Sequence, residues 1–257
     1  MADNSTIEWT EATWNPVTGC DPVSPGCAHC YAKTFAERWR NIPGHPYEQG
    51  FDLRLWPERL DQPLKWTRPR MIFVNSMSDL FHEGVPLEYI EQIFDVMRRA
   101  DHHTFQILTK RPSRVADMAG RLAWPSNVWQ GTSVEDARVI HRLEELRGVP
   151  AAVRFLSCEP LIGPLENLDL TGIGWLIAGG ESGPGYRRVD PEWIVNLRDQ
   201  CVAAAVPFFF KQWGGITPKA GGRILDGVEW SQMPEGIASC PGGVGGHPRR
   251  ATARQGV

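Results

Sequence analysis

The middle of the chain repeats one pattern: a short apolar run, a polar cluster, and then apolar residues at helical spacing. Six apolar runs follow this pattern, and each is closed by polar or charged residues: MIFVNS (71–76), TFQILTK (104–110), NVWQGTS (127–133), VRFLSCEP (153–160), GWLIAGGES (174–182) and PFFFKQWG (207–214). Runs of this kind are typical of strands buried on both faces. The pattern therefore predicts six strands, and a further strand is predicted around residues 13–17.

Amphipathic helices are predicted between these strands. Residues 87–100, LEYIEQIFDVMRRA, carry apolar side chains three and four positions apart. Residues 190–201, DPEWIVNLRDQC, begin with Asp190 as a candidate N-cap and Pro191 at the first helical position. A third helix is predicted over residues 31–39. Alternating strands and helices indicate an α/β protein with a parallel sheet, a partial or complete (β/α) barrel, and a doubly wound sheet is the alternative.

Length and composition fit one barrel domain, residues 1–235, followed by a tail, residues 236–257. The 257 residues are 42% hydrophobic and include 11 tryptophans, which is enough for one substantial core. The tail is rich in glycine and arginine without apolar periodicity, as is typical of a flexible segment. The composition excludes a disordered, collagenous or coiled-coil protein.

Charge and hydropathy restrict the environment of the chain. The net charge is −3, whereas proteins that coat DNA non-specifically are clearly basic. No stretch approaches 18 consecutive apolar residues, and the N-terminal sequence MADNSTIEWTEATW lacks the basic start and apolar core of a signal peptide. We therefore expect a cytoplasmic protein that is not associated with a membrane.

Three of the six cysteines, Cys20, Cys27 and Cys30, fall within eleven residues of a loop rich in proline and glycine. In a reducing compartment such a group favours metal ligation over disulfides. Three thiolates without an obvious fourth suit an iron–sulfur cubane with one open iron better than a closed zinc site. Two alternatives stay open: a zinc site with His29 or Cys158 as a further ligand, and unligated thiols.

Polar residues end each of the six apolar runs. Because the carboxyl ends of barrel strands surround one site, these residues predict a shared polar cavity. Ordinary solvent-facing strand ends are the alternative. The candidate site residues are Ser78, Asp79, Lys110, Arg111, Ser133, Glu135, Glu159 and Glu181, with Lys211, Gln212 and Trp213 as a wall for the substrate.

The segment GCDPVSPGCAHCYA (19–32) resembles the cluster-binding loop of radical S-adenosylmethionine (SAM) enzymes, and its form is similar to that of spore photoproduct lyase and its relatives. The whole chain resembles a phage and prophage family of radical-SAM-like proteins with a three-cysteine motif. This likeness is carried by EWTEATWNPVTGC, VNSMSDLF, ILTKRPSR, FLSCEPLIGP, AGGESGPG and FFFKQWGG, which together span most of residues 7–215. Two features depart from the radical SAM pattern. Cys-x6-Cys replaces Cys-x3-Cys, and the Gly-Gly-Glu sequence at 179–181 follows a late strand instead of the second.

The resemblance implies a [4Fe–4S] cluster held by the three cysteines, with SAM bound at its open iron. One-electron cleavage of SAM would then give a 5′-deoxyadenosyl radical that removes a hydrogen atom from a substrate. The resemblance also implies that Ser78 and Asp79 contact the SAM amino group. Ser133 and Glu135 match in position a region that binds the ribose hydroxyls.

The remaining charged candidates follow from the same resemblance. Lys110 and Arg111 are expected to pair with the SAM carboxylate or a substrate phosphate. Glu159 and Glu181 are candidate acid–base or SAM-binding groups, and together with Lys110 they are the candidate catalytic residues. An electron donor such as flavodoxin or ferredoxin and a nucleic acid or nucleotide substrate are the expected partners. The alternative is a non-catalytic zinc or iron–sulfur protein that acts with a partner.

Overall fold

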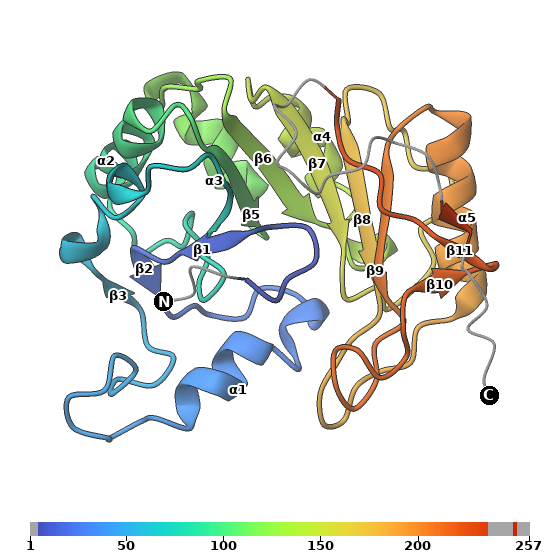
Figure 1. The fold of residues 1–257 in the computed structure, drawn as a ribbon, viewed down its shortest axis with the longest axis horizontal. Helices are drawn as coiled ribbons and strands as arrows, with labels where there is room; N and C mark the ends of the chain where they lie inside the picture. The colour runs from blue at the N-terminus through green and yellow to red at the C-terminus, as the bar shows by residue number, and fades with distance from the viewer. Residues whose placement is uncertain (1–4, 236–248, 251–257) are drawn as a thin grey trace.

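The computed structural model describes residues 5–235 and 249–250, and its central feature is a curved parallel sheet of seven strands (Figure 1). These strands are β1 (Ala12–Trp14), β4 (Met71–Val74), β5 (Thr104–Thr109), β6 (Val128–Ser133), β7 (Val153–Cys158), β8 (Trp175–Gly179) and β9 (Phe208–Gln212). Neighbouring strands are parallel and follow chain order. The predicted α/β partial barrel is thereby confirmed, and chain order excludes the doubly wound alternative.

The outer face of the sheet packs against helices, which enclose the main core. They are α2 (Leu87–Arg99), α3 (Pro112–Met118), α4 (Arg142–Arg147) and α5 (Pro191–Ala203). Outward-facing strand residues such as Ile107 and Leu156 share this core with Ile93 of α2 and Leu197 of α5. The predicted helices at 87–100 and 190–201 are confirmed. The Asp190 side chain accepts a hydrogen bond from the Glu192 N–H at 2.9 Å, as the predicted N-cap requires.

The inner face of the half-barrel is closed at its amino end by aromatic rings. These rings form a second core together with Ile177, and they belong to Trp9, Phe73, Trp129, Phe155, Trp175 and Phe209. A β-carbon on Gly131 would stand 2.4 Å from the Phe155 ring, so this glycine leaves the space that the ring fills. Because side chains alternate along a strand, the next inward positions toward the carboxyl ends are polar, and they include Ser133, Glu159 and Lys211. The sheet thus carries polar groups above an aromatic floor.

Short elements complete the fold. The strands β2 (Val17–Thr18) and β3 (Arg54–Leu55) form an antiparallel pair, and β10 (Ile224–Leu225), β11 (Val228–Glu229) and β12 (Arg249–Arg250) form a small sheet. Helix α1 covers Tyr31–Glu37, and the 3-10 turns are η1 (Pro25–Cys27), η2 (Pro57–Arg59), η3 (Pro63–Lys65), η4 (Ala119–Arg121) and η5 (Ala137–Val139). Apart from β12, the predicted tail at 236–257 lies outside the described residues. Among the helices of the described residues, none has the length and apolar character needed to cross a membrane.

Candidate metal centre

The three-cysteine loop lies at the mouth of the half-barrel. In the view of Figure 1, α1 and the loop before it lie below the curved sheet, on the same side as the loops after β8 and β9. The loop begins at Gly19, whose φ of +86° suits glycine and where a β-carbon would stand 2.2 Å from the Asp52 carbonyl oxygen. It ends at Cys30, the N-cap residue of α1. All three cysteines are half-buried.

The first cysteine is held from the β4 and β5 side of the mouth. The Arg111 Nη1 atom lies 3.5 Å from Cys20 Sγ and 3.2 Å from Asp79 Oδ2, while Nη2 donates to the Asp21 carbonyl. Burial raises the pKa of the Cys20 thiol to about 11 and Asp79 acts in the same direction, whereas the charge and hydrogen bond of Arg111 lower it. Arg111 is therefore the group that favours the thiolate needed for metal binding.

Asp79 forms an ion pair with Arg111 and has further partners of its own. Its carboxylate also accepts hydrogen bonds from Thr109 Oγ1 at 2.7 Å and from the Lys110 N–H at 3.0 Å. The neighbouring Ser78 hydroxyl donates to the Val17 carbonyl at 2.8 Å. Both predicted SAM-contacting side chains thus have protein partners. The structure brings Asp79 and Arg111 together beside Cys20.

The middle of the loop is held by Glu135, which follows β6. Ser24 Oγ donates to Glu135 Oε1 at 2.8 Å and lies 3.9 Å from Cys27 Sγ. The other carboxylate oxygen accepts from Arg142 Nη1 at 3.0 Å, and the Glu135 side chain is 1% exposed. Lys110 Nζ lies 3.4 Å from Glu135 Oε1. A buried carboxylate therefore connects the loop before Cys27 to two cations.

The last part of the loop is held by Glu181, which follows β8. His29 Nδ1 lies 2.8 Å from Glu181 Oε2, and the Arg187 side chain pairs with both carboxylate oxygens. Arg187 Nη1 also donates to the Pro25 carbonyl at 3.0 Å. Burial alone would raise the pKa of Glu181, but the hydrogen bonds from Arg187 and His29 outweigh it and lower the pKa to about 2. Glu181 is thus a charged anchor for the loop.

Two lysines project from the inner face of the sheet. Lys110 Nζ donates to Ser133 Oγ at 3.0 Å, and Lys211 Nζ donates to Glu159 Oε1 at 2.6 Å. Of the predicted substrate wall, Gln212 is buried and bonded to Ser182, and the Trp213 indole donates to the Ile224 carbonyl. The polar strand ends therefore separate into groups that hold the cysteine loop and groups that face the interior.

Sequence reasoning did not identify three residues of this arrangement. They are Ser24, Arg142 and Arg187, which contact the site residues Glu135 and Glu181, and the two arginines lie in segments without a recognisable motif. Ser24 alone had a signal, because it lies in the stretch that lengthens the loop.

The three half-buried thiols are the donor type that an iron–sulfur cluster takes. Cys20 and Cys30 pack against one small apolar cluster that contains Phe51, and the charge of Cys27 acts on Cys20. In residues 5–235 and 249–250, no three His, Cys, Asp or Glu side chains are placed to hold one ion. In a cubane each thiolate binds its own iron.

Of the two alternative ligands, Cys158 lies away from the cysteine loop, whereas His29 lies on the loop itself. The His29 ring is bonded to Glu181. Cys158 is fully buried in the main core on the outer face of the sheet, where Cys201 is also found. The pKa of Cys158 lies well above its ordinary value, mainly because the thiol is buried.

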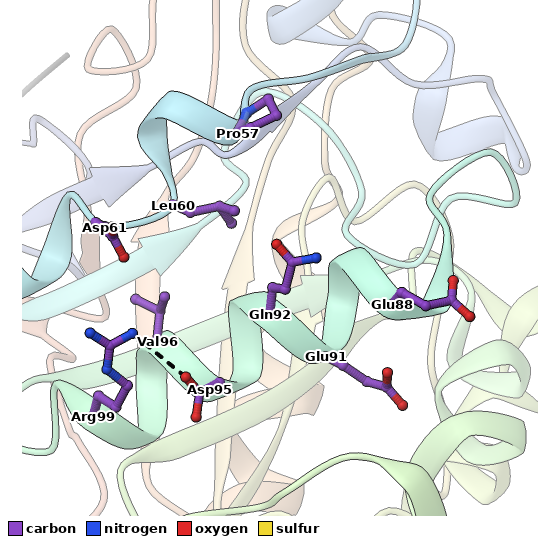
Figure 2. Close-up of a pocket in the computed structure, with 9 residues that line it drawn as sticks. All are labelled: Pro57, Leu60, Asp61, Glu88, Glu91, Gln92, Asp95, Val96 and Arg99. Atoms are coloured by element: carbon purple, nitrogen blue, oxygen red, sulfur yellow. Dashed lines mark ion pairs between the residues drawn. The ribbon is translucent and has the colours of Figure 1, made fainter.

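A separate hollow of about 520 Å³ lies on the outer layer, between α2 and residues 57–61 (Figure 2). Its carboxylates include Glu91 and Asp95, which pair with Arg121 and Arg99. None of the candidate site residues lines it. This hollow therefore does not belong to the cysteine site.

Comparison with known proteins shows the family. A family model described as "Protein of unknown function (DUF5131)" matches residues 4–234. The chain belongs to the DUF5131 family. A search of curated proteins gave no match for this DUF5131 member.

Solved structures of spore photoproduct lyase are similar to this DUF5131 protein at low identity. A variant with bound AdoMet and dinucleoside spore photoproduct is 14% identical with a TM-score of 0.45, covering 65% of this chain and 55% of that one. The lyase complexed with dinucleoside spore photoproduct is 14% identical with a TM-score of 0.43, covering 86% and 65%. A further variant is 16% identical with a TM-score of 0.45, covering 91% and 69%. The chain spans between 55% and 69% of the length of these three proteins.

Proposed function

We propose that the chain is a radical SAM-type enzyme whose Cys20, Cys27 and Cys30 hold a [4Fe–4S] cluster. One observation carries this proposal. Three half-buried thiols lie on one loop at the mouth of a parallel half-barrel, above an inner face lined by polar strand ends. Active sites of (β/α) barrels lie at this end of the strands.

The cluster would supply the redox chemistry, and the residues of the chain would bind and position the cluster. When bound, a cluster of this type would supply the one-electron cleavage of SAM that yields a 5′-deoxyadenosyl radical for hydrogen abstraction from a substrate, with the electron coming from a donor such as flavodoxin or ferredoxin. Arg111 stabilises the Cys20 thiolate, and Asp79 holds Arg111 in place. We assign Asp79 this supporting part because its oxygens already accept hydrogen bonds from the protein.

Lys110 is the residue best placed to bind the carboxylate of SAM. Its ammonium group points into the half-barrel and is bonded to the Ser133 hydroxyl, and the Lys110 side chain is 21% exposed. An ammonium and a hydroxyl side by side offer donors to one carboxylate oxygen each. Glu135 keeps two other partners, Ser24 and Arg142, so Lys110 is free to turn toward a ligand without exposing an unpaired buried charge.

A nucleic acid or nucleotide is the substrate class that we propose. The inner face carries Lys211 and Lys110 as cations, and a phosphate group is an anion that both can meet. The Glu159 side chain beside Lys211 is 16% exposed, and its carboxylate is positioned to accept a proton or a hydrogen bond from the substrate. The aromatic floor beneath excludes water from the lower half of the interior.

Anaerobic reconstitution tests the proposal. We expect about four irons and four sulfides per chain, a broad visible absorption that bleaches with dithionite, and 5′-deoxyadenosine after addition of SAM. Cys27→Ala abolishes all three, whereas Cys201→Ala, which removes a thiol from the core instead, leaves them in place. One zinc per chain without 5′-deoxyadenosine would instead support the non-catalytic metal-binding protein.

A further inference from the structure

The stretch that lengthens the cysteine loop is the part that crosses the mouth of the half-barrel. Six residues separate Cys20 from Cys27, and among them Ser24 bonds to Glu135 after β6, while the Pro25 carbonyl accepts from Arg187 after β8. Two residues further along the loop from Cys27, His29 bonds to Glu181. The residues that lengthen the loop are therefore held by hydrogen bonds to residues that follow the strands.

We propose that Glu181 and Arg187 are positioning residues that fix Cys27 and Cys30 across the mouth before any cluster binds. The part of this proposal that concerns cluster geometry rests on the proposed function. The contacts themselves are made between protein atoms alone. They are made by two side chains that no sequence motif assigned to the cysteine loop.

The two side chains bind residues near Cys27 and next to Cys30. Arg187 holds the carbonyl of Pro25, two residues before Cys27, and Glu181 holds His29, the residue before Cys30. Arg187 is itself fixed by a two-oxygen pairing with Glu181 and by its backbone N–H, which donates to Glu181 Oε2 at 2.8 Å. Because planar guanidinium–carboxylate pairs restrict orientation as well as distance, the pair acts as a rigid clamp.

Cys20 is held by a separate set of residues. Arg111 and Asp79, which contact it, lie after β5 and β4, on the other side of the mouth. Among the described residues, the Arg111–Asp79 pair shares no hydrogen bond or ion pair with the Glu181–Arg187 pair. Loss of the clamp should therefore make Cys27 and Cys30 more accessible and leave the contacts of Cys20 unchanged. A general loss of stability would instead expose all three cysteines.

Alkylation of the metal-free protein measures this difference. Reduced apoprotein is treated with iodoacetamide under anaerobic conditions, and mass spectrometry follows the modification rate of each cysteine. In Arg187→Ala we expect the rates at Cys27 and Cys30 to rise about tenfold, as the loss of one charged hydrogen-bond network predicts, while the rate at Cys20 stays within about twofold. Arg187→Lys, which keeps the charge and one donor position, restores part of the protection.

A matched control separates the clamp from the loss of any arginine. Arg198→Ala also removes an arginine that pairs with two carboxylates, Asp199 and Asp226, but on the outer layer. It should leave all three rates unchanged. Equal acceleration at Cys20, Cys27 and Cys30 in Arg187→Ala, or no acceleration at any of them, would overturn the proposal.

A second readout uses the reconstituted protein. If the clamp sets the cluster geometry, the electron paramagnetic resonance signal of the reduced cluster changes shape in Glu181→Ala and Arg187→Ala, and not in Arg198→Ala. An unchanged signal together with unchanged alkylation rates would reject the positioning role. If the wild-type protein forms no cluster, the proposed function fails, and the alkylation rates still decide whether the clamp exists.

Discussion

Gly26 lies against the Glu135 carboxylate so closely that a β-carbon on Gly26 would stand 2.4 Å from Glu135 Oε1. The carboxylate cannot give way, because it is 1% exposed and bonded to Ser24 and Arg142. In Gly26→Ala we therefore expect the Ser24 contact to break and the free energy of unfolding to fall by about 1–3 kcal/mol, as overpacking does elsewhere. Urea denaturation measures the fall, and iron content after reconstitution measures the displacement of Cys27.

Gly120→Ala is the matched control for this change. A β-carbon on Gly120 would meet nothing within 4 Å. Its stability and iron content should equal those of the wild type. If Gly26→Ala behaves in the same way, the loop does not depend on the close approach to Glu135.

Arg111→Ala should destabilise the protein strongly. The Arg111 and Asp79 side chains are 5% and 8% exposed, so the substitution leaves a buried carboxylate without its cation. Removal of one partner of a buried pair costs about 3–5 kcal/mol, and we expect the lower end because Asp79 keeps its bonds to Thr109 and the Lys110 N–H. Urea denaturation checks this value. Arg98→Ala, which breaks an exposed pair with Asp95, should cost less than about 1 kcal/mol, and equal costs for the two variants would contradict the buried pair.

The strands and the helices α2 and α5 could be predicted from the sequence because they depend on local pattern. The run TFQILTK contains β5, and the periodic stretch 87–100 contains α2, each within a residue or two of its bounds. Burial on both faces makes such strands continuous in apolar residues, and one buried face makes such helices periodic. The partial barrel then follows from strand order.

The partners of the strand-end residues could not be predicted in this way. Glu135 and Ser24 are 111 positions apart in the chain, and Glu181 and His29 are 152 positions apart. A polar residue at the end of a parallel strand is expected at the mouth of a barrel, but its partner depends on how the intervening loops pack. The sequence therefore located these carboxylates without showing that they hold the cysteine loop.

The clamp at Glu181 should make stability depend on pH in the acid range. The pKa of Glu181 falls from its ordinary value of 4.5 to about 2 in the folded protein. A lowered carboxyl pKa contributes stability that is fully present above pH 4.5 and is lost as the pH falls toward 2. Glu181→Gln should therefore lower the free energy of unfolding by about 1.5–3 kcal/mol at pH 6, and by clearly less at pH 3.

Urea denaturation at the two pH values measures this difference. Glu166→Gln, a change at an exposed glutamate, serves as the control and should show a small difference at both pH values. A Glu181→Gln deficit that is the same at pH 3 as at pH 6 would show that the charge of Glu181 does not stabilise the fold.

Lys110→Met should weaken SAM binding without unfolding the protein. The methionine keeps the length and apolar stem of the lysine but removes the ammonium group next to Ser133, and Glu135 retains Ser24 and Arg142 as partners. We expect the dissociation constant for SAM to rise about tenfold or more, the effect of losing one charged hydrogen bond. Isothermal titration calorimetry of the anaerobically reconstituted protein measures it, with Lys65→Met at an exposed position as control. Unchanged SAM affinity in Lys110→Met, with the cluster intact, would place the SAM carboxylate elsewhere in the half-barrel.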